Sequence, residues 1–357
     1  MANIFDYLND VAYDSFYDLP VNELDVLALT ELTYLAFDDV VAQEPKRLID
    51  LAPQIPRETT MLTNKNRLQL LDQLSQHKRF KNCKLSNFIN DIDPELQKQF
   101  AAMTYRISLD TYLLVFRGTD DSIIGWKEDF HMTYMKEIPA QKHALQYLQD
   151  FFAQHPNQKV VLAGHSKGGN LAVYAASQLD PLLQKNIVAV YTFDAPGLHK
   201  ELTETAGYQN MMERTKVFVP QGSIIGMMLE IPDKKIVVRS TALGGIAQHD
   251  TFSWQVEDKH FVQLDETNSD SQQVDTTFKE WVETVPDTEL QLYFDLFFGI
   301  ILDAGISSIN DLSSFKVIEH IHHLFVQAQS LTPEERETMG RLTQLLIDTR
   351  YQAWKNR

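Results

Sequence analysis

The stretch Val160-Val-Leu-Ala-Gly-His-Ser166-Lys-Gly-Gly169 decides the fold. Its first four residues are apolar and predict a short buried strand, whereas residues 167–179 follow the spacing of a helix. Between them, G-x-S-x-G places a glycine two residues to either side of Ser166. This pattern is typical of the nucleophile elbow, a sharp strand-to-helix turn that presents a reactive serine. A glycine-rich turn with an exposed serine is the simpler alternative, but both elements that an elbow requires are predicted.

Strands and helices alternate on both sides of this turn. Such alternation indicates a mostly parallel sheet flanked by helices, and together with the elbow it predicts an α/β-hydrolase fold. The sheet is expected to begin at Met103. The other predicted elements are a hairpin of residues 103–108 and 111–116, a helix at 140–152, and strands at 187–193, 215–219 and 235–239.

Helical patterns precede and follow this core. We predict an N-terminal helical segment packed on the core at residues 1–100, a catalytic core at 101–264 and a C-terminal helical segment at 276–357. In the first segment a helical pattern spans residues 20–41, and Asn22 is placed to cap it. Thr332-Pro333-Glu334-Glu335 forms a capping box with proline at the first helical position. Whether the terminal helices act as a lid is left open.

A serine nucleophile needs a histidine base, which in α/β hydrolases follows the serine along the chain. His249 is the favoured candidate because it lies in a glycine-bearing loop, residues 244–250, that could bring an imidazole over the elbow. The spacing H-E-x-x-H is absent, so no metal site is predicted. The other downstream histidines are His199, His260, His320, His322 and His323, the last three on a helical stretch typical of a solvated face.

The tetrahedral oxyanion needs two hydrogen-bond donors. Arg117-Gly118-Thr119 ends a predicted strand and could present a backbone N–H group, although the same residues could form only a strand-ending turn. The backbone N–H of Lys167, directly after the nucleophile, would be the second donor.

Several of these motifs together resemble the class 3 (fungal-type) lipase-like branch of the α/β hydrolases. They are Phe116-Arg-Gly-Thr-Asp120, Trp126 with Asp129, the Gly164-His-Ser166 elbow and Thr192-Phe-Asp-Ala-Pro-Gly197. The chain is most similar to a group of bacterial lipase-like proteins with G-H-S-K-G-G-N at the elbow and H-D-x-x-S-W-Q-V, here residues 249–256. The resemblance implies an ester-cleaving triad with Ser166 and His249, and an oxyanion hole of Thr119 and Lys167.

The triad acid is where the sequence departs from this family. Class 3 lipases carry the aspartate just after the strand that corresponds to residues 215–219, but Pro220-Gln-Gly-Ser223 follows here. Asp194, at the end of the preceding strand, is the favoured acid, although it could instead bind backbone near Pro196. The alternatives are Glu230, Asp233, Asp250 or a Ser-His dyad without an acid.

The sequence offers two apolar segments as candidate walls of the substrate pocket. Residues 123–126 and 226–229 could line an apolar acyl pocket, or could equally be ordinary core. Lys167 stands where class 3 lipases usually carry leucine, and its side chain is expected near the pocket floor or on the helix surface.

Composition excludes several classes of function. The net charge of −17, without a cluster of Lys and Arg, argues against binding to nucleic acid. Cys83 is the only cysteine, so no intramolecular disulfide can form. The first residues lack the pattern of a signal peptide, and the longest apolar run, residues 296–302, is too short to span a bilayer. These features favour a cytoplasmic location.

The sequence therefore predicts a carboxylic-ester hydrolase that acts on a small ester or acyl substrate and needs no cofactor. An amidase, peptidase or thioesterase would use the same triad. A non-catalytic interaction or regulatory protein on a hydrolase scaffold is the alternative from another class.

Overall fold

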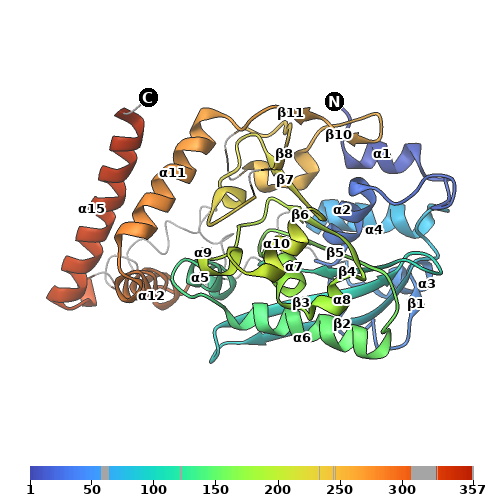
Figure 1. The fold of residues 1–357 in the computed structure, drawn as a ribbon, viewed down its shortest axis with the longest axis horizontal. Coiled ribbons are helices and arrows are strands. Elements are labelled where there is room, and N and C mark those ends of the chain that lie inside the picture. The colour runs from blue at the N-terminus through green and yellow to red at the C-terminus, as the bar shows by residue number, and fades with distance from the viewer. Residues whose placement is uncertain are drawn as a thin grey trace.

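The computed structural model describes residues 1–57, 64–120, 123–232, 234–243, 245, 247–306, 327 and 329–355. Its main sheet has the strand order β1-β2-β3-β4-β5-β6-β7-β8-β11 (Figure 1). Strands β4 to β8 are parallel, whereas β1 to β4 and the β8–β11 pair are antiparallel. The strands are β1 (Lys46–Arg47), β2 (Lys84–Asp93), β3 (Lys98–Arg106), β4 (Tyr112–Phe116), β5 (Val160–His165), β6 (Ile187–Phe193), β7 (Thr215–Pro220), β8 (Lys235–Val238) and β11 (Gln263–Leu264). The predicted α/β-hydrolase class, a sheet flanked by helices with a parallel core, is confirmed, although the sheet as a whole is mixed, with four parallel and four antiparallel strand pairs.

Helices cover both faces of this sheet, and β4 shows how the sequence produces this arrangement. All of its residues are buried. Leu113 and Val115 face one apolar cluster, whereas Leu114 and Phe116 face another, because successive side chains of a strand point to opposite faces. A parallel strand covered on both faces is apolar throughout for this reason.

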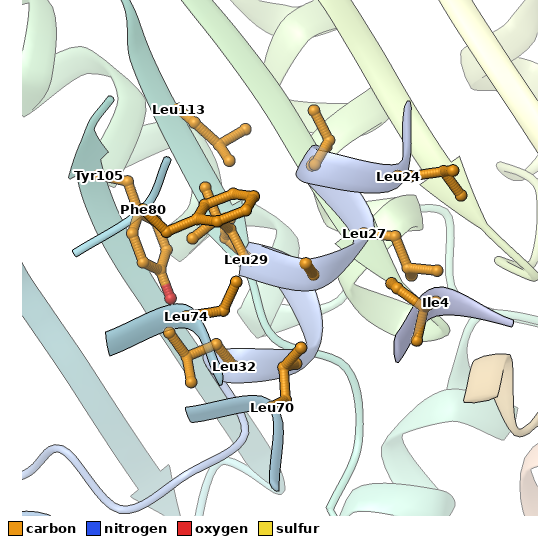
Figure 2. Close-up of a cluster of buried hydrophobic side chains, with 14 of the residues drawn as sticks. Ile4, Leu24, Leu27, Leu29, Leu32, Leu70, Leu74, Phe80, Tyr105 and Leu113 are labelled. Atoms are coloured by element: carbon orange, nitrogen blue, oxygen red, sulfur yellow. The ribbon is translucent and has the colours of Figure 1, made fainter. Parts of the chain in front are cut away.

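The first of these clusters lies under the N-terminal helices. Figure 2 shows Leu24, Leu27, Leu29 and Leu32 of one helix packed against side chains from neighbouring helices and from the sheet. These helices are α1 (Ile4–Asp10), α2 (Glu23–Leu32), α3 (Leu48–Leu51) and α4 (Asn64–Gln76). Every residue of α2 is buried, so this helix is part of the core.

The second cluster lies under helices on the other face of the sheet, chiefly α6 and α7. The helices of the central region are α5 (Ile123–His131), α6 (Pro139–Gln154), α7 (Lys167–Gln178), α8 (Pro181–Gln184), α9 (Lys200–Thr203) and α10 (Ala206–Met212). Short 3-10 turns and a small hairpin of β9 (Val256–Glu257) and β10 (His260–Phe261) complete the core region.

A third apolar cluster joins the C-terminal helices to α5. These helices are α11 (Ser269–Thr284), α12 (Asp287–Asp303) and α15 (Pro333–Lys355). Lys127 of α5 forms an ion pair with Asp295 of α12, at 2.7 Å. The predicted capping box is confirmed, since the Glu335 N–H donates to Thr332 Oγ1 and the Thr332 N–H donates to Glu335 Oε2. Among the described helices, none combines the length and the apolar character that a membrane span requires.

Two expectations about the N-terminal region were wrong. The sheet does not begin at Met103, because β1 and β2 precede it within the segment predicted to be helical. The pairing of β2 with β3 shifts between Ser86 and Ile89, and Asn87 has φ of 53°. This bulge interrupts the period-two pattern by which a strand is found in a sequence. The helix capped by Asn22 also ends at Leu32, earlier than its apolar pattern suggested.

A buried ion pair anchors α2 to the segment after α4. The side chains of Asp25 and Arg79 are fully buried, and Arg79 Nε donates to Asp25 Oδ1 at 2.8 Å. The Tyr7 hydroxyl also donates to Asp25 Oδ1 at 2.8 Å. Two charges removed from water are tolerated because they satisfy each other.

Removal of Asp25 tests how far the fold depends on this pair. We expect Asp25→Ala to lower the free energy of unfolding by about 3–5 kcal/mol, because the Arg79 charge would remain buried without its partner. Chemical denaturation of the purified protein measures this change. Asp50→Ala, which breaks the exposed Arg47–Asp50 pair, is the matched control and should leave the free energy of unfolding nearly unchanged. Equal losses of stability in the two variants would show that the fold depends no more on the buried Asp25–Arg79 pair than on the exposed one.

Candidate active site

The elbow lies at the carboxyl end of β5, where Ser166 connects the strand to α7. Ser166 is buried and has φ of 58° and ψ of −138°. A positive φ is uncommon for a residue other than glycine, so the backbone here is strained. Strain of this kind persists only where the surroundings impose it.

Close packing of two glycines imposes this conformation. A Cβ on Gly164 would lie 2.0 Å from the backbone carbon of Gly168, and one on Gly168 would lie 2.1 Å from the Phe116 carbonyl oxygen. Any larger residue would push α7 away from β4 and β5. The glycines of G-x-S-x-G are thus required for the approach of helix to sheet, as the sequence pattern predicted.

The structure brings His249 and Asp194 together. His249 Nδ1 lies 2.6 Å from Asp194 Oδ2. Asp194 follows β6, the strand next to β5 in the sheet, so its carboxyl group is at the same edge as the elbow. The His249 ring is half-buried, and its centroid lies 4.5 Å from that of His165, the residue before the elbow serine.

Three further hydrogen bonds hold the fully buried Asp194, two to its carboxylate and one from its backbone. Asp194 Oδ1 accepts hydrogen bonds from the Ser223 hydroxyl and from the Gly226 N–H, the latter at 3.1 Å. The Asp194 N–H donates to the Phe218 carbonyl at 2.8 Å. A Cβ on Gly226 would come within 2.4 Å of Asp194 Oδ1, so only glycine lets this N–H approach. The loop after β7 thus supplies donors to the acid.

The other candidate acids lie in different surroundings. Glu230 pairs through its backbone with Leu198 and lines a neighbouring pocket. Asp250 Oδ1 accepts from the Phe252 N–H at 3.2 Å and caps a 3-10 turn. Asp233 lies outside the described residues. No hydrogen bond is described between the Asp194 carboxylate and the backbone of Pro196, the structural role that the sequence left open.

Residues that sequence reasoning missed hold the His249 loop in place. Gln248 Oε1 accepts from the Gly222 N–H at 2.7 Å, and the backbone oxygen of Gln248 accepts from Trp254 Nε1 at 2.9 Å. Both side chains are buried. The signal in the sequence was that Gln248 directly precedes His249 and that Trp254 lies in the H-D-x-x-S-W-Q-V segment.

A second histidine-carboxylate contact lies behind the first. His165 Nδ1 is 2.9 Å from Glu31 Oε1, and His165 Nε2 donates to the His249 carbonyl at 3.1 Å. Glu31 also accepts from Arg67 and from the Thr251 hydroxyl. Burial acts to raise the pKa of Glu31, but Arg67 and His165 hold it well below its ordinary value. Glu31 of α2 is therefore a buried anion in contact with His165, the residue before Ser166.

The residues predicted as oxyanion donors lie beside the elbow serine: Lys167 follows Ser166, and a Cβ on Gly118, next to Thr119, would come within 2.9 Å of Ser166 Cβ. Among the described residues, the backbone N–H groups of Thr119 and Lys167 have no acceptor. The Gly118 N–H donates to the Tyr34 hydroxyl at 3.0 Å, and the Thr119 hydroxyl donates to Asp129 Oδ2 at 2.6 Å. The N-terminus of α7 adds the positive end of its dipole.

The Lys167 side chain is not on the helix surface, one of its two expected places, but it contacts Asp129, which lines the cavity at Ser166. It is fully buried, with Nζ 2.7 Å from Glu128 Oε2 and 3.5 Å from Asp129 Oδ1. Burial acts to lower the pKa of Lys167, but the two carboxylates raise it above its ordinary value. Lys167 thus stays charged and ties the elbow to α5.

A small cavity opens beside Ser166, with a volume of about 20 Å³. Trp126, Met228 and Leu229, three of the residues expected to line an acyl pocket, lie in its wall. Ile123 instead belongs to the cluster of the C-terminal helices, and the side chain of Ile124 is not described. A space of this size holds about one water molecule.

Of the other downstream histidines, two lie in the described residues, and both have partners elsewhere. His260 Nδ1 lies 2.7 Å from Glu23 Oε1, and its side chain is largely exposed. His199 caps α9. His320, His322 and His323 lie outside the described residues. Within the described ranges, no cluster of histidine, cysteine and carboxylate side chains could hold a metal ion.

Comparison with known proteins gives one family match. A family model described as Mbeg1-like matches residues 74–299. No match was found among the curated proteins.

Several lipases are similar in structure at low sequence identity. Mono- and diacylglycerol lipase from Aspergillus oryzae is 16% identical with a TM-score of 0.42, over 69% of this chain and 87% of that one. M37 lipase is 16% identical with a TM-score of 0.38, over 58% and 70% of the two chains. Rhizomucor miehei lipase in a propeptide complex is 16% identical with a TM-score of 0.33, over 51% and 68%.

The environment of Asp129 makes the stability of the fold depend on pH. Burial raises the pKa of Asp129 from its ordinary 3.8 to about 6, although Lys167 and Thr119 act to lower it. The folded protein therefore holds this proton more tightly than the unfolded chain does. The Asp129 contribution to stability is fully present below the unfolded pKa and is lost as the pH rises through about 6.

Asp129→Asn removes this titration and tests it. Between about pH 4 and pH 7 we expect wild type to lose up to about 3 kcal/mol of stability relative to Asp129→Asn. Chemical denaturation of both proteins at the two pH values measures the difference. Parallel stability curves for the two proteins would show that Asp129 does not titrate in this range.

Proposed function

The chain belongs to the Mbeg1-like family, and we propose that it is a serine hydrolase that cleaves carboxylic esters through an acyl-enzyme on Ser166. The observation that carries this proposal is the His249–Asp194 pair, at 2.6 Å, at the carboxyl end of the parallel strands, where strained Ser166 follows β5. In the proposed site, Ser166 is the nucleophile, His249 the base and Asp194 the orienting acid.

In the proposed reaction, Ser166 Oγ attacks the acyl carbon while His249 Nε2 takes the hydroxyl proton. The contact of His249 Nδ1 with Asp194 keeps the proton on Nδ1, so that Nε2 is free to act as the base. The Asp194 carboxylate then stabilises the imidazolium. The same imidazolium returns the proton to the leaving alcohol, and water resolves the acyl-enzyme by the reverse steps.

The backbone N–H groups of Thr119 and Lys167 are the proposed oxyanion hole. The hydrogen bond from Thr119 to Asp129 and the ion pair from Lys167 to Glu128 support this role, because they fix both residues from the α5 side. Donors that are already oriented stabilise the developing charge without reorganising during the reaction.

The proposed substrate is a small carboxylic ester, and the chemistry requires no cofactor. Within the resemblance to class 3 lipases, we place the chain with the bacterial lipase-like proteins that carry lysine after the nucleophile. We also propose a cytoplasmic location, which suits a single cysteine, Cys83, that is buried and unpaired. An amidase or a thioesterase would pass through the same acyl-enzyme. Rates measured on an ester, an amide and a thioester of the same acyl group distinguish the three activities.

Replacement of the nucleophile is the first test. We expect wild type to hydrolyse p-nitrophenyl acetate and to be labelled by a fluorophosphonate probe. Ser166→Ala should abolish labelling and lower kcat by on the order of 10⁴ to 10⁶. Undiminished turnover in Ser166→Ala would contradict the assignment of the nucleophile, and an inert wild type would favour a non-catalytic protein on this scaffold.

Replacement of the acid is the second test. Asp194→Asn should fold normally and lose at least about 10² in kcat, because an amide cannot hold the imidazole in the required tautomer. Glu230→Gln, which changes a carboxylate outside the triad, is the matched control and should lose much less. Steady-state kinetics and thermal melting are measured on the same preparations. An Asp194→Asn protein that melts early with full activity per folded molecule would give Asp194 a structural role only.

A further inference from the structure

A second and much larger pocket adjoins the cavity at Ser166. It has a volume of about 530 Å³ and lies between α11 (orange in Figure 1) and residues 198–200 and 229–230. This volume falls within the range of small-molecule sites, about 300–1,000 Å³. The cavity at Ser166, by contrast, holds about one water molecule, so an ester there needs additional space.

Leu229 lies in the wall of both the larger pocket and the cavity at Ser166. Its backbone has φ of 63°, which is a genuine outlier for a bulky side chain. The chain is held on either side of it, since the Gly197 N–H donates to the Met228 carbonyl at 2.8 Å and Glu230 exchanges two backbone hydrogen bonds with Leu198. The backbone of Leu229 is thus held between fixed neighbours, and its partly buried side chain packs against the second apolar cluster.

The chemistry of the larger pocket suits an uncharged chain. Its apolar lining includes buried Leu198 and Val285 and half-buried Phe278 and Val282. Charged side chains of both signs lie around it, and the lining includes Lys200 and Lys279 together with Glu230, Glu283 and Asp287. Because acidic groups outnumber the lysines, this lining offers no net attraction to an anion such as phosphate.

We propose that this pocket receives the acyl chain of the ester and that Leu229 determines how long a chain can pass from Ser166 into it. The proposal rests on the proposed function, since it assigns the substrate of that same site. Rotation of the Leu229 side chain would join the larger pocket to the cavity at Ser166 while the backbone stays in place. The ligand class is an ester with a medium-length, unbranched and uncharged acyl group.

Chain-length preference tests the assignment. Val282→Trp on α11 should fill the pocket and lower the ratio of kcat/KM for p-nitrophenyl octanoate to that for the acetate by at least about tenfold. Leu229→Gly should raise the same ratio several-fold, because it removes the side chain and glycine accepts a positive φ. Val188→Trp on the exposed surface of β6 is the matched control and should not change the ratio.

A binding measurement separates failure of the pocket from failure of the proposed function. In Ser166→Ala protein, the uncharged ester methyl octanoate should bind, and addition of Val282→Trp should weaken its affinity at least about tenfold by titration calorimetry. A protein that binds methyl octanoate in this way but does not react with a fluorophosphonate would overturn the proposed function and leave the pocket. The pocket assignment would be overturned if Val282→Trp changed neither the octanoate-to-acetate ratio nor the affinity for methyl octanoate, or if Ser166→Ala protein did not bind methyl octanoate.

Discussion

The crossing of α7 over the ends of β4 and β5 constrains the rest of this structure. At Gly164 and Gly168 the backbones approach so closely that a single added Cβ would overlap backbone atoms at 2.0 to 2.1 Å. The chain can turn from strand to helix in that space only by placing Ser166 at positive φ. The same crossing brings the N-terminus of α7 and the end of β4 to one point, so the serine and both proposed oxyanion donors share a sheet edge.

Asp194, the proposed triad acid, lies at the same end of the parallel strands and depends on donors from neighbouring loops. A buried carboxylate is stable only when donors satisfy its oxygens. Asp194 receives them from the loop after β7, through the Ser223 hydroxyl and the Gly226 N–H, and from His249. The loop after β7 has no carboxylate of its own at residues 220–223, and it holds the carboxylate that follows the neighbouring strand.

Buried charges connect the added helices to the elbow. Glu31 of α2 contacts His165 at 2.9 Å, and Glu128 of α5 contacts Lys167 at 2.7 Å, so the residues on both sides of Ser166 are paired to carboxylates from separate helices. Buried pairs add little net stability because desolvation offsets their attraction, but they accept few alternative geometries. The N-terminal helices and α5 are therefore part of the frame that orients the elbow.

The sequence by itself determined the elbow, the parallel core strands and the loop that carries His249, because each depends on a local pattern of apolar spacing, glycine and turn residues. Only the tertiary structure decided which carboxylate meets His249, since Asp194, Glu230 and Asp250 are alike in chemistry and differ only in where the folded chain places them. The contacts of Glu31 with His165 and of Lys167 with Glu128 were hidden for the same reason, because their partners lie far apart in sequence. Strand β2 escaped prediction because its bulge at Asn87 breaks the alternation, and pairing with β3, which no local pattern records, is what holds it in the sheet.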